Sequence, residues 1–360
     1  MRTPRGCIIN RRIALAALTN RRRLDLSSPT DTTALENIVN ASPLDDDREA
    51  LLDRFRGVIL GLAAGNALGL PVEGESAHAI RRHFPAGVTE VSAEERDRPW
   101  DDDLAQAAIL AEVLLESEEL DPEVFAARLV VWARANGRGI GGLTRSVIDE
   151  LSRNSSSQEA AREAWERNAM SNAGNGAVMR CPPVALRHLR SGADLVRTAR
   201  TSALVTHYDA RCEWSTVVTA VALATCLNGK PVAVGDLAPA VEAIGGQGWL
   251  ADSIEQVAEA THGVEGATLE GLELDDPVDM GYTLKAMQVA LWCMAQSGGL
   301  EQTVVAVVNE GGDTDTNGAI AGAVMGARYG ASSIPSRWLE NIADTQHLTE
   351  LANRLFEVGS

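Results

Sequence analysis

Two short acidic stretches carry the residue types best suited to hold a metal ion. In "PWDDDLAQAAIL", residues 99–110, three consecutive acids, Asp101, Asp102 and Asp103, stand directly before an apolar run. In "NEGGDTDTNGAIAG", Asp313 and Asp315 alternate with threonines before a second apolar run. Hard divalent cations such as Mg²⁺ prefer oxygen ligands, and carboxylates one residue apart beside a hydroxyl supply several of them from one turn.

Each stretch taken alone also has a simpler explanation. Aspartate and threonine are common at helix starts, where they cap free N–H groups and face the positive end of the helix dipole. A run of like charges is usually solvated. Capping gives no reason, however, for two such clusters far apart in the sequence. If the two helix starts converge, the carboxylates share one pocket, and a pair of metal ions relieves their repulsion.

Composition limits the classes of partner. The chain has 360 residues, of which 45% are hydrophobic, and its net charge is 32 − 50 = −18. This charge argues against broad binding to nucleic acid or to an anionic membrane, and a substrate that carries phosphate needs local cations. The five cysteines show no CxxC spacing, which is typical of a reduced cytoplasmic protein. The composition leaves the oligomeric state open.

The elements that must position the acids are helices. From about residue 49 onward apolar residues recur at spacings of three and four, and the connections are short and rich in Gly, Asn and Pro. Asp121 and Pro122, for example, open a helical pattern that closes near Gly137. We therefore predict one all-α domain over residues 49–360. Residues 1–48 are basic and then polar, with an apolar run too short for a signal peptide, and are predicted to be a mobile extension.

Two stretches with glycine at every fourth residue are predicted to form the centre of the domain. This spacing keeps the glycines on one helical face, where another backbone can approach closely. Each glycine costs about 1 kcal/mol of helix propensity relative to alanine, so close packing must compensate. The uncharged runs 57–72 and 316–327 are shorter than the roughly 20 residues that span a bilayer, which favours a core position. The glycines are Gly57, Gly61, Gly65, Gly69, Gly318, Gly322, Gly326 and Gly330.

Two further segments place glycine before an apolar helical pattern. They are "NGRGIGGLTRSVIDEL" and "SNAGNGAVMRCPPVAL". Helix N-termini bind phosphate through free N–H groups, and glycine permits close approach, although an ordinary tight turn explains each segment equally well. "VTHYDARCEWS" adds His207 and Tyr208 between predicted helices, where a lone histidine is more often structural than catalytic.

Taken together and in order, these segments resemble the ADP-ribosylglycohydrolase family. The resemblance runs from about residue 54 to 335 and is carried by "FRGVILGLAAGNALGLPVEG", "PWDDDLAQA", "GRGIGGLT", "GNGAVMRCPPVAL", "VTHYDA" and "GGDTDTNGAIAGAVMGARYG". It implies an all-α orthogonal multi-helix bundle with two Mg²⁺ ions, or Mn²⁺ in their place, in a central cleft. The implied activity is hydrolysis of the glycosidic bond between ADP-ribose and an acceptor. That acceptor is an ADP-ribosylated protein side chain or a small ADP-ribose derivative.

The resemblance also implies roles for individual residues. The family's metal motifs, Trp-Thr-Asp-Asp-Thr and Gly-Gly-Asp-Thr-Asp-Thr, fall on residues 100–104 and 311–316. The implied metal ligands are Asp101, Asp102, Asp103, Asp313, Asp315 and Thr316. The implied catalytic residues are Glu73, Asp103 and Asp315, and the implied lining of the ADP-ribose cleft is Gly139, Gly141, Asn175, Gly176 and His207.

Three positions depart from the family pattern. Asp101 and Leu104 each stand where the family has threonine, and Asn66 stands where the family's Gly-Asp-Ala-Leu-Gly segment has aspartate. These departures leave open a relative that binds ADP-ribose, or plays a structural part, without efficient turnover. Helical enzymes that act on isoprenoid diphosphates also use aspartates and Mg²⁺, but they line their pockets with aromatic residues, which make up only 4% of this chain.

Overall fold

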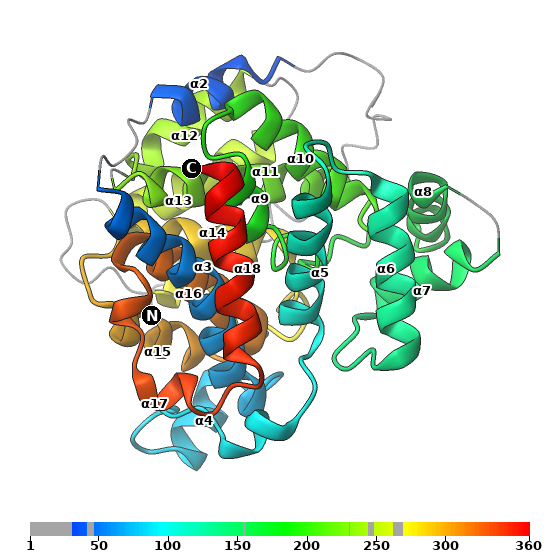
Figure 1. The fold of residues 1–360 in the computed structure, drawn as a ribbon. Coiled ribbons are helices and arrows are strands. Elements are labelled where there is room, and N and C mark those ends of the chain that lie inside the picture. Colours follow the sequence, from blue (N-terminus) through cyan, green and yellow to red (C-terminus); the bar gives the residue numbers. More distant parts are fainter. Residues whose placement is uncertain (1–30, 42–46, 154–155, 230, 244–247, 262–268) are drawn as a thin grey trace, which may run out of the picture.

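The computed structural model describes residues 31–41, 47–153, 156–229, 231–243, 248–261 and 269–360 (Figure 1). Within these residues the regular elements are helices and there is no strand, so the predicted all-α class is confirmed. The α-helices are α2 (Thr33–Ala41), α3 (Arg48–Gly69), α4 (Ala77–His83), α5 (Asp102–Glu116), α6 (Pro122–Ala135), α7 (Gly142–Leu151), α8 (Ser157–Arg167), α9 (Pro182–Arg187), α10 (Gly192–Leu204), α11 (Ala210–Leu227), α12 (Val234–Glu242), α13 (Gly248–Thr261), α14 (Thr283–Ala295), α15 (Leu300–Val308), α16 (Thr314–Tyr329), α17 (Ser336–Leu339) and α18 (Thr345–Gly359). Short 3₁₀ helices are η1 (Leu70–Val72), η2 (Ala93–Asp97), η3 (Leu269–Leu272) and η4 (Ala331–Ser333).

The glycine stripes bring α3 and α16 into direct backbone contact, as predicted. A Cβ atom added to Gly65 would lie 1.9 Å from the carbonyl oxygen of Gly318, and one added to Gly61 would lie 2.2 Å from that of Gly322. The pairing runs antiparallel, so the end of α3 meets the start of α16. At that end, a Cβ atom on Gly69 would lie 2.2 Å from the carbonyl oxygen of Thr314. No side chain fits in this seam, which explains why the stripes are glycine.

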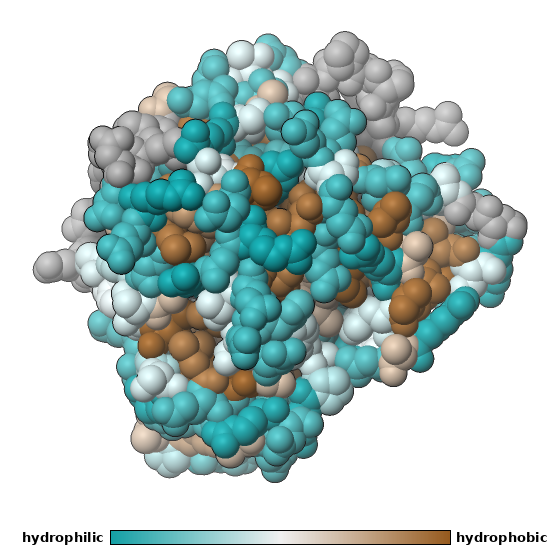
Figure 2. Space-filling view, in the orientation of Figure 1, coloured by the Kyte–Doolittle hydropathy of each residue, from teal (hydrophilic) through white to brown (hydrophobic). Residues whose placement is uncertain are grey.

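The central pair is enclosed by other helices. Helices α5, α11, α14 and α18 pack around α3 and α16, and nearly all residues of α11 and α14 are buried (Figure 1). The segment Arg48–Val72 has the length and hydropathy of a membrane-crossing helix, but 83% of its most apolar window is buried inside the molecule. It is therefore the core helix of this fold. The surface in Figure 2 is mostly hydrophilic, with scattered apolar patches.

Helices α6, α7 and α8 form the edge of the molecule farthest from α15 in Figure 1. Helices α7 and α8 share a small apolar cluster of their own, separate from the main core. Helix α6 begins after Asp121, whose carboxylate accepts N–H groups of the first turn, in agreement with the prediction for residues 121–137. The four cysteines in the described part of the chain are buried and form no disulfide.

Two details differ from the sequence-based prediction. Residues 33–41 belong to the predicted mobile extension, yet they form α2, whose Leu35 and Val39 are buried against α10 and α11. Their apolar residues lie four apart and so share one face, which is why the segment packs. Residues 1–30 and 42–46 lie outside the described residues. The second difference lies in the segment "SNAGNGAVMRCPPVAL". Its helix, α9, starts at Pro182 rather than directly after Gly176, because residues 176–180 form turns.

Candidate functional site

Both acidic stretches lie at helix starts, but their first acids do not act as caps. Asp101 is the N-cap residue of α5 and Asp313 that of α16, and neither forms a side-chain capping hydrogen bond. Four other aspartates at N-cap positions do accept backbone N–H groups, namely Asp47, Asp121, Asp209 and Asp344. The carboxylates of Asp101 and Asp313 are therefore available for another use.

The first acidic stretch is a buried group of three carboxylates. Asp101 is 1% exposed, Asp102 8% and Asp103 1%, and one oxygen of each lies within 4.8 Å of the others. Burial, followed by the charges of Asp101 and Asp313, raises the pKa of Asp102 to about 7. Burial and the neighbouring carboxylates also raise the pKa of Asp103 well above its usual range. The charges are thus crowded and poorly solvated.

The second acidic stretch joins the first in the same place. Asp315 is buried, and burial together with the charges of Asp103 and Asp313 raises its pKa well above its usual range. The Thr316 side chain interacts with the Asp103 carboxylate and lessens the rise of its pKa, which links the start of α16 to the start of α5. The structure therefore brings together the acids that the sequence places far apart.

The Gly311–Gly312 pair holds the loop that carries Glu73 against the second stretch. Both glycines have φ of 77°, and the N–H of Gly74 donates to the carbonyl of Gly312 at 2.8 Å. A Cβ atom on Gly312 would lie 2.0 Å from the carbonyl oxygen of Leu274. Glu73 lies at the solvent-accessible rim. Partial desolvation, then the charges of Asp313 and Asp101, raise its pKa.

Three buried oxygens in this group have no hydrogen-bond partner. They are the Oδ1 atoms of Asp101, Asp103 and Asp315. Among the described residues, no lysine or arginine forms a salt bridge with these carboxylates. Buried polar atoms are nearly always paired, so the orphaned oxygens require an explanation. A donor set made only of crowded carboxylate oxygens, without an ion pair in the described part of the chain, fits a hard divalent cation.

The loop around Asn175 closes another side of the group. The Asn175 side chain donates from Nδ2 to Oδ2 of Asp313 at 2.8 Å. Its backbone N–H donates to the carbonyl of Gly281 at 3.1 Å, and Gly174 forms a β-bridge with Tyr282. These contacts place the predicted cleft residue Asn175 directly on a predicted metal ligand.

His207 supports this loop from behind. Its ring lies against Gly176, where an added Cβ atom would come within 2.9 Å of Cε1. Its Nδ1 forms a hydrogen bond of 2.7 Å with the hydroxyl of Thr206. Burial, with a smaller effect of Arg180, lowers the pKa of His207 to about 3, so the ring is neutral. The packing gives His207 a structural contact with Gly176.

The two predicted glycines of the third loop have different surroundings. Gly139 has φ of 78°, and an added Cβ atom would lie 2.4 Å from Oδ1 of Asp102. Gly141 is the N-cap residue of α7, where no side chain caps the helix and an added Cβ atom would meet nothing within 4 Å. Gly139 thus touches the acidic group, whereas Gly141 faces open space at a helix start.

Sequence reasoning missed a buried cation behind the acids. Arg180 is fully buried and donates to Oε1 of Gln106 and to the hydroxyl of Thr206, each at 2.7 Å. Gln106 in turn donates from Nε2 to Oδ2 of Asp102 at 3.4 Å. Burial lowers the pKa of Arg180 to about 9. A lone charged residue inside the apolar run "AVMRCPPVAL" was the available signal.

The three departures from the family pattern fall in two kinds of environment. Leu104 is 4% exposed and packs in the main core. Asn66, in contrast, donates from Nδ2 to Oδ2 of Asp101 at 3.0 Å. Two of the departures therefore touch one another.

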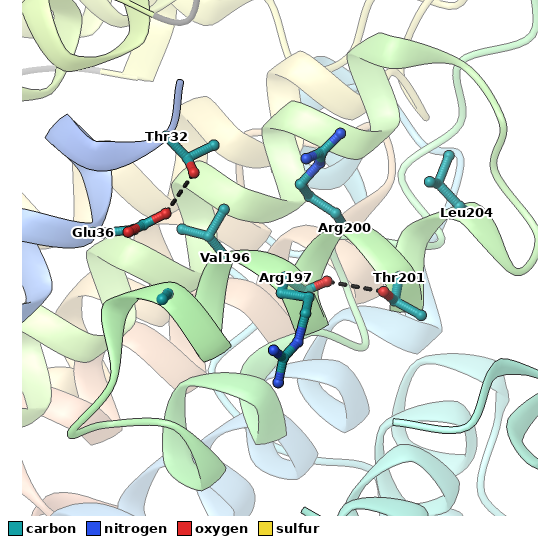
Figure 3. Close-up of a pocket in the computed structure, with 8 residues that line it drawn as sticks. Thr32, Glu36, Val196, Arg197, Arg200, Thr201 and Leu204 are labelled. Atoms are coloured by element: carbon teal, nitrogen blue, oxygen red, sulfur yellow. Dashed lines mark hydrogen bonds between the residues drawn. The ribbon is translucent and has the colours of Figure 1, made fainter. Parts of the chain in front are cut away.

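A separate cavity of about 240 Å³ lies between α2 and α10 (Figure 3). Thr32 donates to Glu36 there, and Thr201 donates to the carbonyl of Arg197. Arg200 is paired with Glu213. The cavity contains none of the predicted site residues, and its lining is Thr32, Glu36, Ala193, Val196, Arg197, Arg200, Thr201 and Leu204.

The helical fold and the buried acidic group define a protein of known type. The family model for ADP-ribosylglycohydrolase matches residues 47–360, so the chain belongs to the ADP-ribosylglycohydrolase family, whose members hydrolyse ADP-ribose linkages. A solved structure described as an "ADP-ribosylglycohydrolase-related protein complex" is similar, with a TM-score of 0.65 and 30% identity, over 87% of this chain and 100% of that chain.

Three relatives support this assignment. The chain is 28% identical to "ADP-ribosylarginine hydrolase Tri1" of Pseudomonas putida, over 86% of this chain and 79% of the relative. It is 29% identical to "ADP-ribosyl-[dinitrogen reductase] glycohydrolase" of Rhodospirillum rubrum, over 81% and 90%. A protein of Archaeoglobus fulgidus described as uncharacterized is 33% identical over 85% and 97%.

Proposed function

We propose that the chain is a Mg²⁺-dependent hydrolase that releases ADP-ribose from a modified protein side chain. The observation that carries this proposal is the set of buried, unpartnered carboxylate oxygens on Asp101, Asp103 and Asp315. Two relatives, from Pseudomonas putida and Serratia proteamaculans, are named ADP-ribosylarginine hydrolases. ADP-ribosylarginine is therefore the first substrate to test.

The residues that would hold two Mg²⁺ ions are Asp101, Asp102, Asp103, Asp313, Asp315 and Thr316. Divalent cations, when bound, supply positive charge that holds substrate oxygens and makes bound water more acidic. Asn175 holds the carboxylate of Asp313 in place through its hydrogen bond, and the Thr316 side chain interacts with the carboxylate of Asp103. In this proposal, the chain's own contribution to binding is a prearranged set of oxygens.

Glu73 is the residue best placed to move a proton. It lies at the rim of the acidic group, and its raised pKa brings its carboxylate closer to the range useful for a general base. Its carboxylate accepts a proton from the attacking water. Cleavage of a glycosidic bond builds positive charge on the sugar ring, which the carboxylates of Asp103 and Asp315 favour electrostatically.

The diphosphate of the substrate requires donors in a chain of net charge −18. The start of α7 offers N–H groups that no side chain caps, next to Gly141 and open space. Helix N-termini bind anions through such groups. The loop 139–141 connects this helix start to Asp102, so it can seat the diphosphate while the ribose reaches the acids.

The direct test is release of ADP-ribose from an ADP-ribosylated arginine peptide and from a matched serine peptide. We expect EDTA to abolish release and added Mg²⁺ or Mn²⁺ to restore it. Asp315→Ala should reduce the rate at least about a hundredfold, since it removes a buried ligand oxygen. The control Asp121→Asn, at an exposed helix start, should retain the rate. Full activity of Asp315→Ala would contradict the proposal.

A relative that binds without turnover is the second candidate, because Asn66 and Asp101 both depart from the family pattern within the acidic group. Calorimetry with Mg²⁺ and then ADP-ribose separates the two candidates. Binding of both, with no release from any peptide in the panel, would favour the binding protein.

A further inference from the structure

A buried hydrogen bond connects the core helix α3 to the first acidic stretch. Asn66 lies on α3 and is 3% exposed, and Asp101 lies at the start of α5 and is 1% exposed. The Asn66 amide donates from Nδ2 to Oδ2 of Asp101 at 3.0 Å. The other oxygen of Asp101, Oδ1, has no partner, and Asp101 belongs to the group of three carboxylates whose ligand atoms lie within 4.8 Å of one another.

The glycine seam fixes the backbone of α3 beside Asn66. Its neighbour Gly65 lies against Gly318, where an added Cβ atom would be 1.9 Å from the carbonyl oxygen. Helix α3 cannot move toward or away from α16 at this level without losing that close backbone contact. Asn66 therefore presents its Nδ2 atom from a rigid support, and the hydrogen bond restricts rotation of the Asp101 carboxylate.

The identities of the two residues decide on which side of their contact the negative charge lies. In this chain asparagine at position 66 supplies the donor and aspartate at position 101 supplies the negative charge. A hydroxyl facing a carboxylate and an amide facing a carboxylate both give one donor and one negative charge. In this chain the negative charge lies on the α5 side, beside Asp102 and Asp103.

We propose that Asn66 is a positioning residue that turns Oδ1 of Asp101 toward the metal site, and that Asn66 and Asp101 act as one unit. The inference rests on the proposed function, because it presumes that Asp101 is a metal ligand. Leucine at position 66 would leave Oδ2 of Asp101 unpaired and the carboxylate free to rotate. Aspartate at position 66 would face Asp101 with a second carboxylate, next to the two that already repel it.

The first test is a double-mutant cycle on Mg²⁺ affinity, measured by calorimetry on the full chain after EDTA treatment and at one pH. Asn66→Leu should weaken Mg²⁺ binding by about tenfold, since residues that orient metal ligands typically contribute this much. In the Asp101→Thr background the same change should alter the affinity less than about twofold, because its effect passes through Asp101. A residue that only supports the fold would not give this dependence.

The second test exchanges the pair and keeps the proposal falsifiable if Asn66→Leu does not fold. Asn66→Asp should lower the melting temperature of the metal-free chain, and the double variant Asn66→Asp with Asp101→Thr should recover most of the loss. The double variant should also bind Mg²⁺ more tightly than Asp101→Thr alone, since a hydroxyl held by a fixed acceptor is again available.

The outcomes separate this inference from the proposed function. Absence of Mg²⁺ and Mn²⁺ binding in the unaltered chain would overturn the metal centre and this inference with it. Mg²⁺ binding that Asn66→Leu leaves unchanged, or that it weakens equally in both backgrounds, would overturn this inference alone. Equal loss of melting temperature from Asn66→Asp in both backgrounds would do the same.

Discussion

The starts of α5 and α6 place the same residue type at the same helical position with opposite results. Asp121 precedes α6, is exposed, and accepts the N–H groups of Glu123 at 2.9 Å and Val124 at 3.2 Å. Asp101 precedes α5, is 1% exposed, and forms no side-chain capping hydrogen bond. Its oxygens instead face Asn66 and the other carboxylates.

The difference shows that an aspartate before a helix is not in itself informative about function. A solvated cap satisfies two backbone donors and stabilises its helix by about 1 kcal/mol. Buried carboxylates without cations are unfavourable, because desolvation and mutual repulsion both oppose their charge. The start of α5 therefore lowers the stability of the metal-free chain, whereas the start of α6 raises it.

The largest expected difference between the two regions is in activity. Asp103→Asn, which keeps the size of the side chain but removes its charge, should lower ADP-ribose release at least about a hundredfold by analogy with other orienting or ligating groups. Asp121→Asn should change it less than about twofold, since asparagine also caps helices. Steady-state rates with saturating Mg²⁺ measure both. Equal effects would erase the distinction between site and cap.

The carboxylates at the start of α5 should destabilise the metal-free chain but stabilise the chain when Mg²⁺ is bound. At a Mg²⁺ concentration about a hundred times the Kd, the folded chain should gain about 2.7 kcal/mol. Asp103→Asn should raise the melting temperature of the chain in EDTA, because it removes one of several repelling charges, and should lose most of the gain from Mg²⁺. Thermal unfolding with and without Mg²⁺ is the measurement. A variant that is less stable in EDTA would count against the repulsion argument.

The loop before α7 offers a matched pair of glycines. Gly139→Ala should destabilise the chain by about 2 kcal/mol and weaken Mg²⁺ binding, because φ of 78° strains alanine and the new methyl group displaces Asp102. Gly141→Ala should leave both unchanged, since nothing lies within 4 Å of the added atom. Calorimetry and thermal unfolding of the two variants test this. An identical response would show that the loop does not touch the acidic group.

The smallest expected effect is on the free energy of unfolding, when the capping residue Asp121 of α6 is replaced. Asp121→Ala should lower the free energy of unfolding by about 1 kcal/mol, through loss of two hydrogen bonds to the first turn of α6. The loss should be the same in EDTA and in Mg²⁺, because α6 starts away from the acidic group. Urea unfolding in both conditions measures it. A loss confined to one condition would indicate that the α6 start is coupled to the metal site.

Local pattern was sufficient for much of the fold. Spacings of three and four marked the helices, and the glycines at every fourth residue predicted the close pairing of α3 with α16, because helix faces repeat over a few neighbouring residues. Local pattern failed where tertiary contacts decide. Residues 33–41 pack as α2 instead of belonging to a mobile extension, and the helix after Gly176 starts only at Pro182.

The sequence by itself determined the chemistry available to this protein: two acidic stretches at helix starts, glycines that allow close approach, and the order of motifs that places it in its family. Only the tertiary structure decided which acids cap and which are buried together, that Asn66 faces Asp101, and that Arg180 lies behind Asp102. The physical reason is the sequence distance over which the interactions act. Helix formation depends on residues a few positions apart, whereas burial and charge repulsion depend on neighbours brought together from α3, α5 and α16.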